Sequence, residues 1–193
     1  MYQKRNNYLD ILALFLGDYN KQFYLREISK LAKIPLKTTQ NLLSQLQKDK
    51  ILKSIISGKN KYFRLNLNDI RAKLYIFQAE IYRTLIFVEK YPIFKIFLKE
   101  IKTNAPIIIF GSFAKFKAEK NSDLDLLILS KEKQNLPFYL LPYKIHEIKL
   151  SEADFIKSFE KQETLIKEVQ ENHIILNNHS FYTNAIWNYY GKQ

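Results

Sequence analysis

A Gly-Ser pair and two aspartates stand at the ends of two apolar runs in the middle of the sequence. Gly111-Ser112 follows the run Ile107–Phe110, and Asp123 and Asp125 lie at the leading end of the next run. Both runs are short and bounded by polar or turn residues, which predicts two buried strands. Because residues i and i+2 of a strand face the same side, the two aspartates would present their carboxylates together. Two like charges so close are costly unless a cation lies between them.

The chemistry that these residues predict is the binding of a metal ion and of phosphate. Mg²⁺ in proteins usually takes one or two carboxylates together with substrate phosphates. Glycine lets the backbone approach a ligand closely, and the amides at a helix start attract anions. We therefore expect a nucleotide site with phosphate at Gly111-Ser112 and Mg²⁺ at Asp123 and Asp125. An exposed polar turn is the alternative, and we favour it less because the two motifs occur together between two strands.

The same stretch resembles a known family. Gly111-Ser112-Phe113-Ala114-Lys115 followed by Asn121-Ser122-Asp123-Leu124-Asp125-Leu126 is similar to the signature of the polymerase-beta-type nucleotidyltransferase superfamily, and is closest to its minimal nucleotidyltransferase branch. The resemblance covers about residues 104–190 and implies Mg²⁺-dependent transfer of a nucleoside monophosphate from ATP or another NTP to a protein or RNA hydroxyl. It also implies that Gly111 and Ser112 bind phosphates and that Lys115 neutralises charge nearby. Phe116 is a departure, because the branch usually has a Gly shortly after the Ala-Lys pair.

The resembled superfamily places a third carboxylate on a later strand. Residues 144–150 alternate as a strand should, and Glu147 is the acid that matches, although the family usually has Asp. The resemblance thus assigns catalysis and metal binding to Asp123, Asp125 and Glu147. A surface Glu on an edge strand is the equally weighted alternative for Glu147. His146 has either a core role or a base-contact role, and we favour the structural one; we interpret His173 and His179 as structural residues.

Basic charge gathers in the first third of the chain. The formal net charge is +12, and residues 1–70 hold 13 Lys or Arg against 5 Asp or Glu, whereas residues 71–193 hold 18 against 14. Part of the lysine excess reflects a general preference for Lys, Asn and Ile in this sequence. The uneven distribution nevertheless favours a polyanionic partner for the first third.

The pattern of residues 1–67 predicts three helices and a β-hairpin. Apolar spacing indicates helices over about 7–18, 25–32 and 35–50, and a Gly-containing turn at Ser57–Asn60 joins two short strands. This order resembles the winged helix-turn-helix family, which implies that the third helix enters the major groove of DNA. A helical protein-interaction domain with a basic face is the alternative. The residues that we expect to contact DNA are Lys37, Thr38, Gln40, Asn41, Lys59, Lys61 and Arg64.

We therefore expect an α+β protein with three segments. These are a winged helix-turn-helix domain at 1–67, a helical connector at 68–103, and a small mixed-sheet nucleotidyltransferase domain at 104–193. The connector helices could pack within one chain or form the face of a homodimer. The absence of Cys excludes disulfides and thiolate metal sites. No apolar run is long enough to span a membrane, and acidic flanks argue against a signal peptide at residues 11–16, so we expect a cytoplasmic protein.

The expected partners are double-stranded DNA, an NTP and a second protein. Minimal nucleotidyltransferases often act as antitoxins beside a helical toxin, and the resemblance suggests such a toxin partner here. A DNA-binding domain on the same chain would suit regulation of the shared operon. The alternative function is that of a DNA-binding transcriptional regulator whose degenerate nucleotidyltransferase domain only senses nucleotide.

Overall fold

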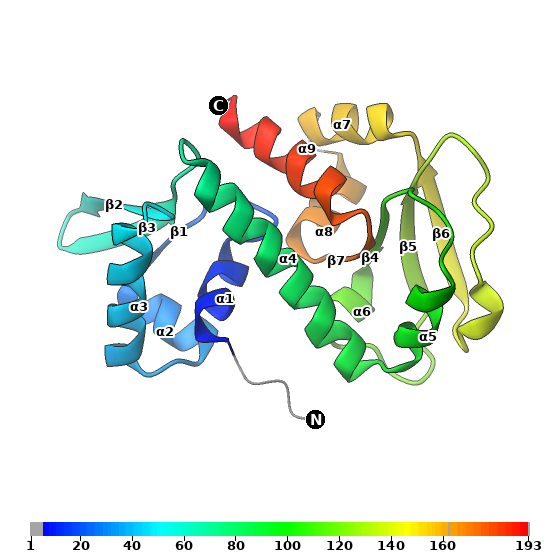
Figure 1. Cartoon of the computed structure of the whole chain (residues 1–193), viewed down its shortest axis with the longest axis horizontal. Coiled ribbons are helices and arrows are strands. Elements are labelled where there is room, and N and C mark those ends of the chain that lie inside the picture. Colours follow the sequence, from blue (N-terminus) through cyan, green and yellow to red (C-terminus); the bar gives the residue numbers. More distant parts are fainter. Residues whose placement is uncertain (1–5, 162, 193) are drawn as a thin grey trace. The chain divides into compact units, whose positions relative to one another are not determined.

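The computed structural model describes residues 6–161 and 163–192 and divides the chain into two compact units. The first unit holds the described residues up to Ala79 together with those from Ile186 onward, and the second holds Glu80–Ala185. Helix α4 (Ile70–Lys90) and helix α9 (His179–Gly191) are labelled in Figure 1. The boundary between the units falls within each of them, after Ala79 and after Ala185. This division differs from the three predicted segments, because it passes through α4 and leaves no separate connector.

The first unit contains helices and a three-stranded antiparallel sheet in the strand order β1-β3-β2. Its elements before α4 are α1 (Asn7–Leu12), the 3-10 turn η1 (Ala13–Phe15), β1 (Gln22–Tyr24), α2 (Leu25–Ala32), α3 (Leu36–Lys48), β2 (Leu52–Ser57) and β3 (Asn60–Leu65). The predicted hairpin is the β2–β3 pair, in which Ser57 lies opposite Asn60. Strand β1 was not predicted, and the first α-helix ends well before the predicted residue 18.

The turn between α2 and α3 is held by side-chain hydrogen bonds. Lys33 ends α2 in the left-handed conformation with φ 53°, and the buried Thr39 hydroxyl donates to the carbonyl oxygens of Ile34 and Pro35. Leu43 and Leu46 of α3 are buried, whereas Leu36 is 45% exposed. Leu36 is the first residue of α3.

The second unit is built around a mixed four-stranded sheet in the order β6-β5-β4-β7. Its elements after α4 are α5 (Ile93–Glu100), β4 (Ile107–Phe110), α6 (Gly111–Ala114), β5 (Leu124–Leu129), the 3-10 turn η2 (Phe138–Leu140), β6 (Ile145–Leu150), α7 (Glu152–Glu160), α8 (Thr164–Glu171) and β7 (Ile174–Asn177). Strands β5 and β6 run parallel, whereas β4 pairs antiparallel with both β5 and β7. The predicted α+β class and the mixed sheet are confirmed.

The central strands of this sheet are buried on both faces. All four residues of β4 are buried, and so are five of the six residues of β5. The exception in β5 is Asp125, which is partly exposed. It lies near the start of the strand, at the end of the sheet next to α6. Phenylalanines from α4, α5 and α6 fill the core on the side of Leu124 and Leu126. In the described part of the chain, no helix is at once long and apolar enough to cross a bilayer.

Candidate functional site

Gly111 lies in direct contact with Asp125. Strand β4 ends at Phe110, which pairs with Asp125 across the sheet, and α6 begins at the next residue. Gly111 has φ +68°, and a Cβ built on it would lie 2.2 Å from Asp125 Oδ2. Both the left-handed backbone and the closeness of this carboxylate therefore require glycine. Gly111 and Asp125 of the sequence motif are thus packed against each other, and the absence of a side chain on Gly111 leaves room for the Asp125 carboxylate.

The loop after α6 contains a residue in the left-handed backbone conformation that is not a glycine. Phe116, where the resembled branch usually has Gly, has φ 57°. This conformation costs a non-glycine residue about 1–2 kcal/mol. The Phe116 ring packs 6.2 Å from the Phe87 ring, the Lys90 ammonium lies 5.6 Å from the ring centroid, and Lys90 also donates to the Phe116 carbonyl. Helix α4 thus holds the loop in a shape that glycine would adopt more easily.

Backbone hydrogen bonds connect the loop after α6 to Gly111 and Ser112. The Lys117 amide donates to the Ser112 carbonyl at 3.0 Å, and the Lys115 amide donates to the Gly111 carbonyl at 3.1 Å. The Lys115 ammonium lies 3.3 Å from Glu168 Oε1 on α8, a half-exposed ion pair. Gly111 and Ser112 therefore stand together at the end of β4, while the Lys115 charge is already paired with an acid of α8.

The two aspartates each face a cationic or hydrogen-bonding partner from β6 or its start. Lys144 Nζ lies 3.2 Å from Asp123 Oδ2, and His146 Nδ1 lies 3.0 Å from Asp125 Oδ1. The Asp123 side chain is 47% exposed and that of Asp125 is 26% exposed, so solvent and ligands reach both carboxylates. Asp123 comes just before β5 and Asp125 lies within it. Accessible carboxylates are the kind of ligand that Mg²⁺ takes, together with substrate phosphates.

Glu147 lies away from this pair. In the parallel β5–β6 register, His146 is opposite Asp125 and Glu147 is opposite the buried Leu126. Because side chains alternate along a strand, Glu147 belongs to the other face of the sheet, where its carboxylate pairs with Lys149 at 3.2 Å. The structure therefore does not bring the predicted third carboxylate to Asp123 and Asp125, and His146 stands in its place.

No group of three His, Asp or Glu side chains among the described residues is arranged to hold a metal ion as it stands. The expected site of three carboxylates is therefore reduced to the two aspartates. The alternation of residues 144–150 already separates His146 from Glu147 in the sequence. Only the register with β5 decides which of them shares the face of Asp125.

The other two histidines belong to a buried polar network. His173 and Glu80 are each 1% exposed, with His173 Nε2 3.0 Å from Glu80 Oε1 and His173 Nδ1 3.0 Å from the Val169 carbonyl oxygen. The Thr84 hydroxyl donates to the Ile175 carbonyl at 2.7 Å and lies 3.0 Å from His179 Nε2, and burial lowers the pKa of His179. These contacts join α4 to β7, α8 and α9, which agrees with a structural role for both histidines.

Comparison with known protein families gives one match, and that match includes the residues of the candidate site. Residues 93–181 match a family model described as polymerase beta, nucleotidyltransferase. The match supports a polymerase-beta-type nucleotidyltransferase domain. It runs from α5 to the start of α9 and includes Gly111, Ser112, Asp123 and Asp125. No curated protein and no solved structure matches the chain.

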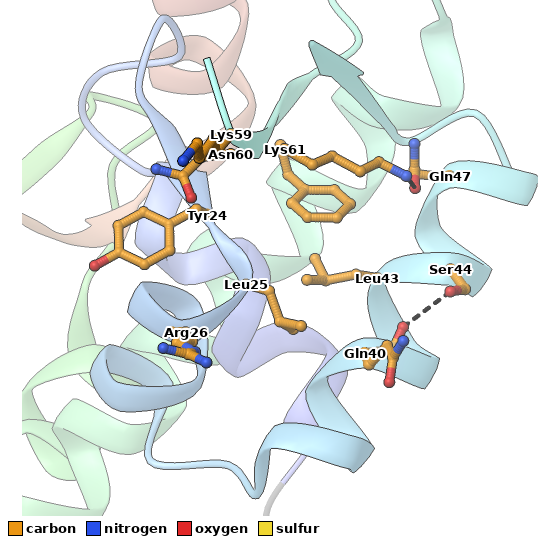
Figure 2. Close-up of a pocket in the computed structure, with 11 residues that line it drawn as sticks. Tyr24, Leu25, Arg26, Gln40, Leu43, Ser44, Gln47, Lys59, Asn60 and Lys61 are labelled. Carbon is orange, nitrogen blue, oxygen red and sulfur yellow. Dashed lines mark hydrogen bonds between the residues drawn. The ribbon is translucent and has the colours of Figure 1, made fainter. Parts of the chain in front are cut away.

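Outside the segment that matches the nucleotidyltransferase model, the first unit carries a groove of about 680 Å³ beside α3 (Figure 2). Three cationic side chains, three amides, a serine and two aromatic rings contribute to its wall, and the described residues that line it include no acid. The lining residues are Tyr24, Leu25, Arg26, Gln40, Leu43, Ser44, Gln47, Lys59, Asn60, Lys61 and Phe63. A groove of this composition suits an anionic polymer or a phosphorylated ligand.

The structure brings some of the predicted DNA contacts together at this groove. Gln40, Lys59 and Lys61 line it, whereas Lys37 and Asn41 are exposed elsewhere on α3 and Thr38 is half-buried. Arg64 pairs with Lys53 in the β2–β3 register, on the opposite face of the hairpin from Lys61 and Phe63. Sequence reasoning missed Tyr24, Arg26 and Asn60, since nothing in the pattern joins them to α3, and it also missed Gln47 on α3 itself.

Gln47 fixes the hairpin against α3. Its amide nitrogen donates to the Ser54 hydroxyl of β2 at 2.9 Å, and its amide oxygen accepts from Lys61 Nζ of β3 at 3.0 Å. Figure 2 shows the Lys61 chain directed toward Gln47 across the groove. One side chain thus sets the position of both strands relative to the helix.

Proposed function

We propose that the second unit is a nucleotidyltransferase that moves a nucleoside monophosphate from an NTP, with ATP the first candidate, to a hydroxyl of a protein or RNA. The observation that carries the proposal is the contact of Gly111 with Asp125 inside the segment that matches the nucleotidyltransferase model. That contact supports the proposal because it brings the residue proposed to bind phosphate beside one proposed to bind the metal ion.

In the proposed reaction the acceptor oxygen attacks the α-phosphorus of the NTP. The bond from that phosphorus to the bridging oxygen breaks, pyrophosphate leaves, and the acceptor proton passes to water. Gly111 and Ser112 would hold the β- and γ-phosphates, and Asp123 and Asp125 would hold Mg²⁺. The bound ion would neutralise charge on the phosphates and on the leaving pyrophosphate. Lys144, which is 83% exposed beside Asp123, is a further cation available to the phosphates at this edge.

The test is transfer of labelled NTP to a candidate acceptor in the presence of Mg²⁺. Asp125→Asn should lower the rate by roughly two orders of magnitude or more, because it removes a carboxylate charge that would hold the metal ion. Glu147→Gln is the matched control, since Glu147 lies on the opposite face and should leave the rate within about a factor of two. Equal labelling by wild type and Asp125→Asn would overturn the proposal.

For the first unit we propose binding of double-stranded DNA, with α3 in the major groove and the β2–β3 hairpin beside it. The element order of helix, strand, helix, helix and hairpin and the acid-free groove support the resemblance to winged helix-turn-helix domains. Gln40 has the chemistry to pair with an adenine edge, and Arg26, Lys59 and Lys61 have that of phosphate contacts.

The salt dependence of DNA affinity tests this second proposal. Lys61→Gln should weaken binding and reduce the log–log slope of affinity against salt by about 0.9, which is the contribution of one phosphate contact. Lys53→Gln removes a lysine from the opposite face of the same hairpin and should leave the slope unchanged. A slope near zero for the wild-type chain would contradict a phosphate-contacting groove.

A regulator without catalysis is the competing proposal, and two observations favour it: Glu147 lies off the site, and Phe116 replaces the usual glycine. Such a protein would bind DNA and sense a nucleotide. Its nucleotide affinity would not respond to Mg²⁺, whereas that of the enzyme would rise with it. The antitoxin role suggested by the resemblance would add a toxin acceptor, and co-purification with a small helical partner that becomes labelled would test it.

A further inference from the structure

Three side chains of α4 contact the loop after α6, and all of them belong to the second unit. Arg83, Phe87 and Lys90 follow one another at helical spacing, so they lie on one face of α4. Arg83 Nη2 donates to the Ala114 carbonyl oxygen at 3.3 Å, and Lys90 donates to that of Phe116. The Phe116 ring packs on Phe87, and its centroid lies 6.0 Å from the Arg83 guanidinium and 5.6 Å from the Lys90 ammonium.

These contacts bond carbonyl oxygens next to the proposed phosphate site. Backbone amides of the loop already donate to the carbonyl oxygens of Gly111, Ser112 and Phe113. The two cations of α4 donate to those of Ala114 and Phe116. Because a carbonyl oxygen repels phosphate and an amide attracts it, a loop that binds phosphate must keep its carbonyl oxygens turned away from the ligand. Helix α4 provides the donors that hold two of them.

Arg83 is placed where it lowers the stability of the domain. Its Nε is buried and has no hydrogen-bond partner among the described residues. Burial lowers the pKa of its guanidinium, and Glu80, whose charge opposes that shift, is hydrogen-bonded to His173. A buried donor that is left unsatisfied costs free energy of folding, so its presence in a native structure points to a role other than stability.

We propose that Arg83 and Lys90 are positioning residues of the nucleotide site. They hold the loop after α6 with its Ala114 and Phe116 carbonyl oxygens toward α4, and their positive charges attract the phosphates of the NTP. The proposal rests on the nucleotidyltransferase function proposed above. It assigns part of the phosphate site to a helix that precedes the matched segment, residues 93–181.

The two cations of α4 differ from Lys115, to which the resemblance assigns the neutralisation of charge. The Lys115 ammonium lies 3.3 Å from a carboxylate oxygen of Glu168, so part of its charge is already compensated. Arg83 and Lys90 form no ion pair with a carboxylate in the described part of the chain. Their charges are therefore available to an anionic ligand of the loop.

The experiment measures the ATP affinity of the full chain by calorimetry with Mg²⁺ present, and the free energy of unfolding in urea for the same variants. Arg83→Met and Lys90→Met should each weaken ATP binding by about tenfold, because the loop loses a carbonyl contact and the site loses a positive charge. Arg83→Met should keep or raise the stability of the domain, since it removes an unsatisfied buried donor. Lys90→Arg keeps the charge and the donor, and its affinity should stay within about twofold of the wild type.

Lys133→Met is the matched control for the loss of one positive charge. Lys133 is exposed and lies beyond the end of β5 that is far from Asp125, so this variant should bind ATP as the wild type does. An equal loss of affinity in Lys133→Met would attribute the effect to net charge and would overturn the inference.

The remaining outcomes separate the failure of this inference from that of the proposed function. ATP binding by the wild type that neither Arg83→Met nor Lys90→Met weakens would overturn the role of the two cations and leave the nucleotide site in place. A loss of affinity in Arg83→Met that accompanies a lower free energy of unfolding, or one in Lys90→Met that Lys90→Arg shares, would also overturn that role. A wild-type chain that binds no ATP would overturn the nucleotide site and this inference with it.

Discussion

Replacing Gly111 with alanine should cost more stability than the same change at any position that merely has a positive φ. Gly111→Ala carries two costs. The backbone at φ +68° would be held by a residue with a Cβ, at about 1–2 kcal/mol. The new methyl group would also lie 2.2 Å from Asp125 Oδ2, so that either Asp125 or the backbone at the end of β4 has to move.

Gly58 supplies a matched control for the first of these costs. It has φ +59° in the β2–β3 turn, and a Cβ there would meet no atom within 4 Å. Gly58→Ala should therefore cost only the backbone term, about 1 kcal/mol. Gly111→Ala should cost about 1–3 kcal/mol beyond that, the usual penalty for overpacking a close contact. The difference between the two variants measures the contact of Gly111 with Asp125.

Urea unfolding is the assay, read with two probes because the chain has two compact units. Trp187 is the only tryptophan and belongs to the first unit, so its fluorescence should follow Gly58→Ala, while far-ultraviolet circular dichroism follows both variants. The decisive variant combines Gly111→Ala with Asp125→Ala. With the carboxylate gone, the excess cost should fall to near zero. An excess that persists in the Asp125→Ala background would refute the assignment of the clash to Asp125.

Two further predictions concern the buried network of the second unit. Glu80→Ala leaves the buried His173 without its carboxylate and should destabilise that unit by about 3–5 kcal/mol in urea unfolding; a cost below about 1 kcal/mol would contradict the pairing. Burial lowers the pKa of His179 below its ordinary 6.5, so the unfolded chain takes up the proton first as the pH falls. This contribution to stability is therefore complete above pH 6.5 and is lost as the pH falls toward the lowered pKa of the folded state. His179→Gln should flatten the stability profile in that window, and identical profiles for the two proteins would exclude His179 as the source.

Strands β4 and β5 of the second unit were predictable because each is a short apolar run bounded by polar or turn residues. Strand β6 followed from the alternation of residues 144–150, and it begins within one residue of its predicted start. Strand β1 was missed because Gln22–Tyr24 is only three residues long and becomes a strand by pairing with β3. Its formation depends on a residue 40 positions away, for which local pattern carries no signal.

The candidate site was predictable where one segment of chain builds it and not where two strands meet. Gly111, Ser112, Asp123 and Asp125 all lie on the β4–α6–β5 segment, so their proximity follows from strand geometry alone. The third position depends on the register between β5 and β6, and a shift of one residue exchanges His146 for Glu147. The family resemblance favoured the acid by its residue type, whereas the register favours its neighbour.

Phe116 has a consequence for how the loop after α6 meets its ligand. A glycine would reach φ 57° with less strain, but it would also give the unliganded loop many other conformations. Phe116, packed on Phe87 and beside Lys90, restricts that ensemble when the domain folds. The loss of conformational entropy then falls on folding and not on binding, so a ligand at Gly111-Ser112 meets a loop that is already ordered. The departure from the motif exchanges some stability of the free protein for preorganisation of its site.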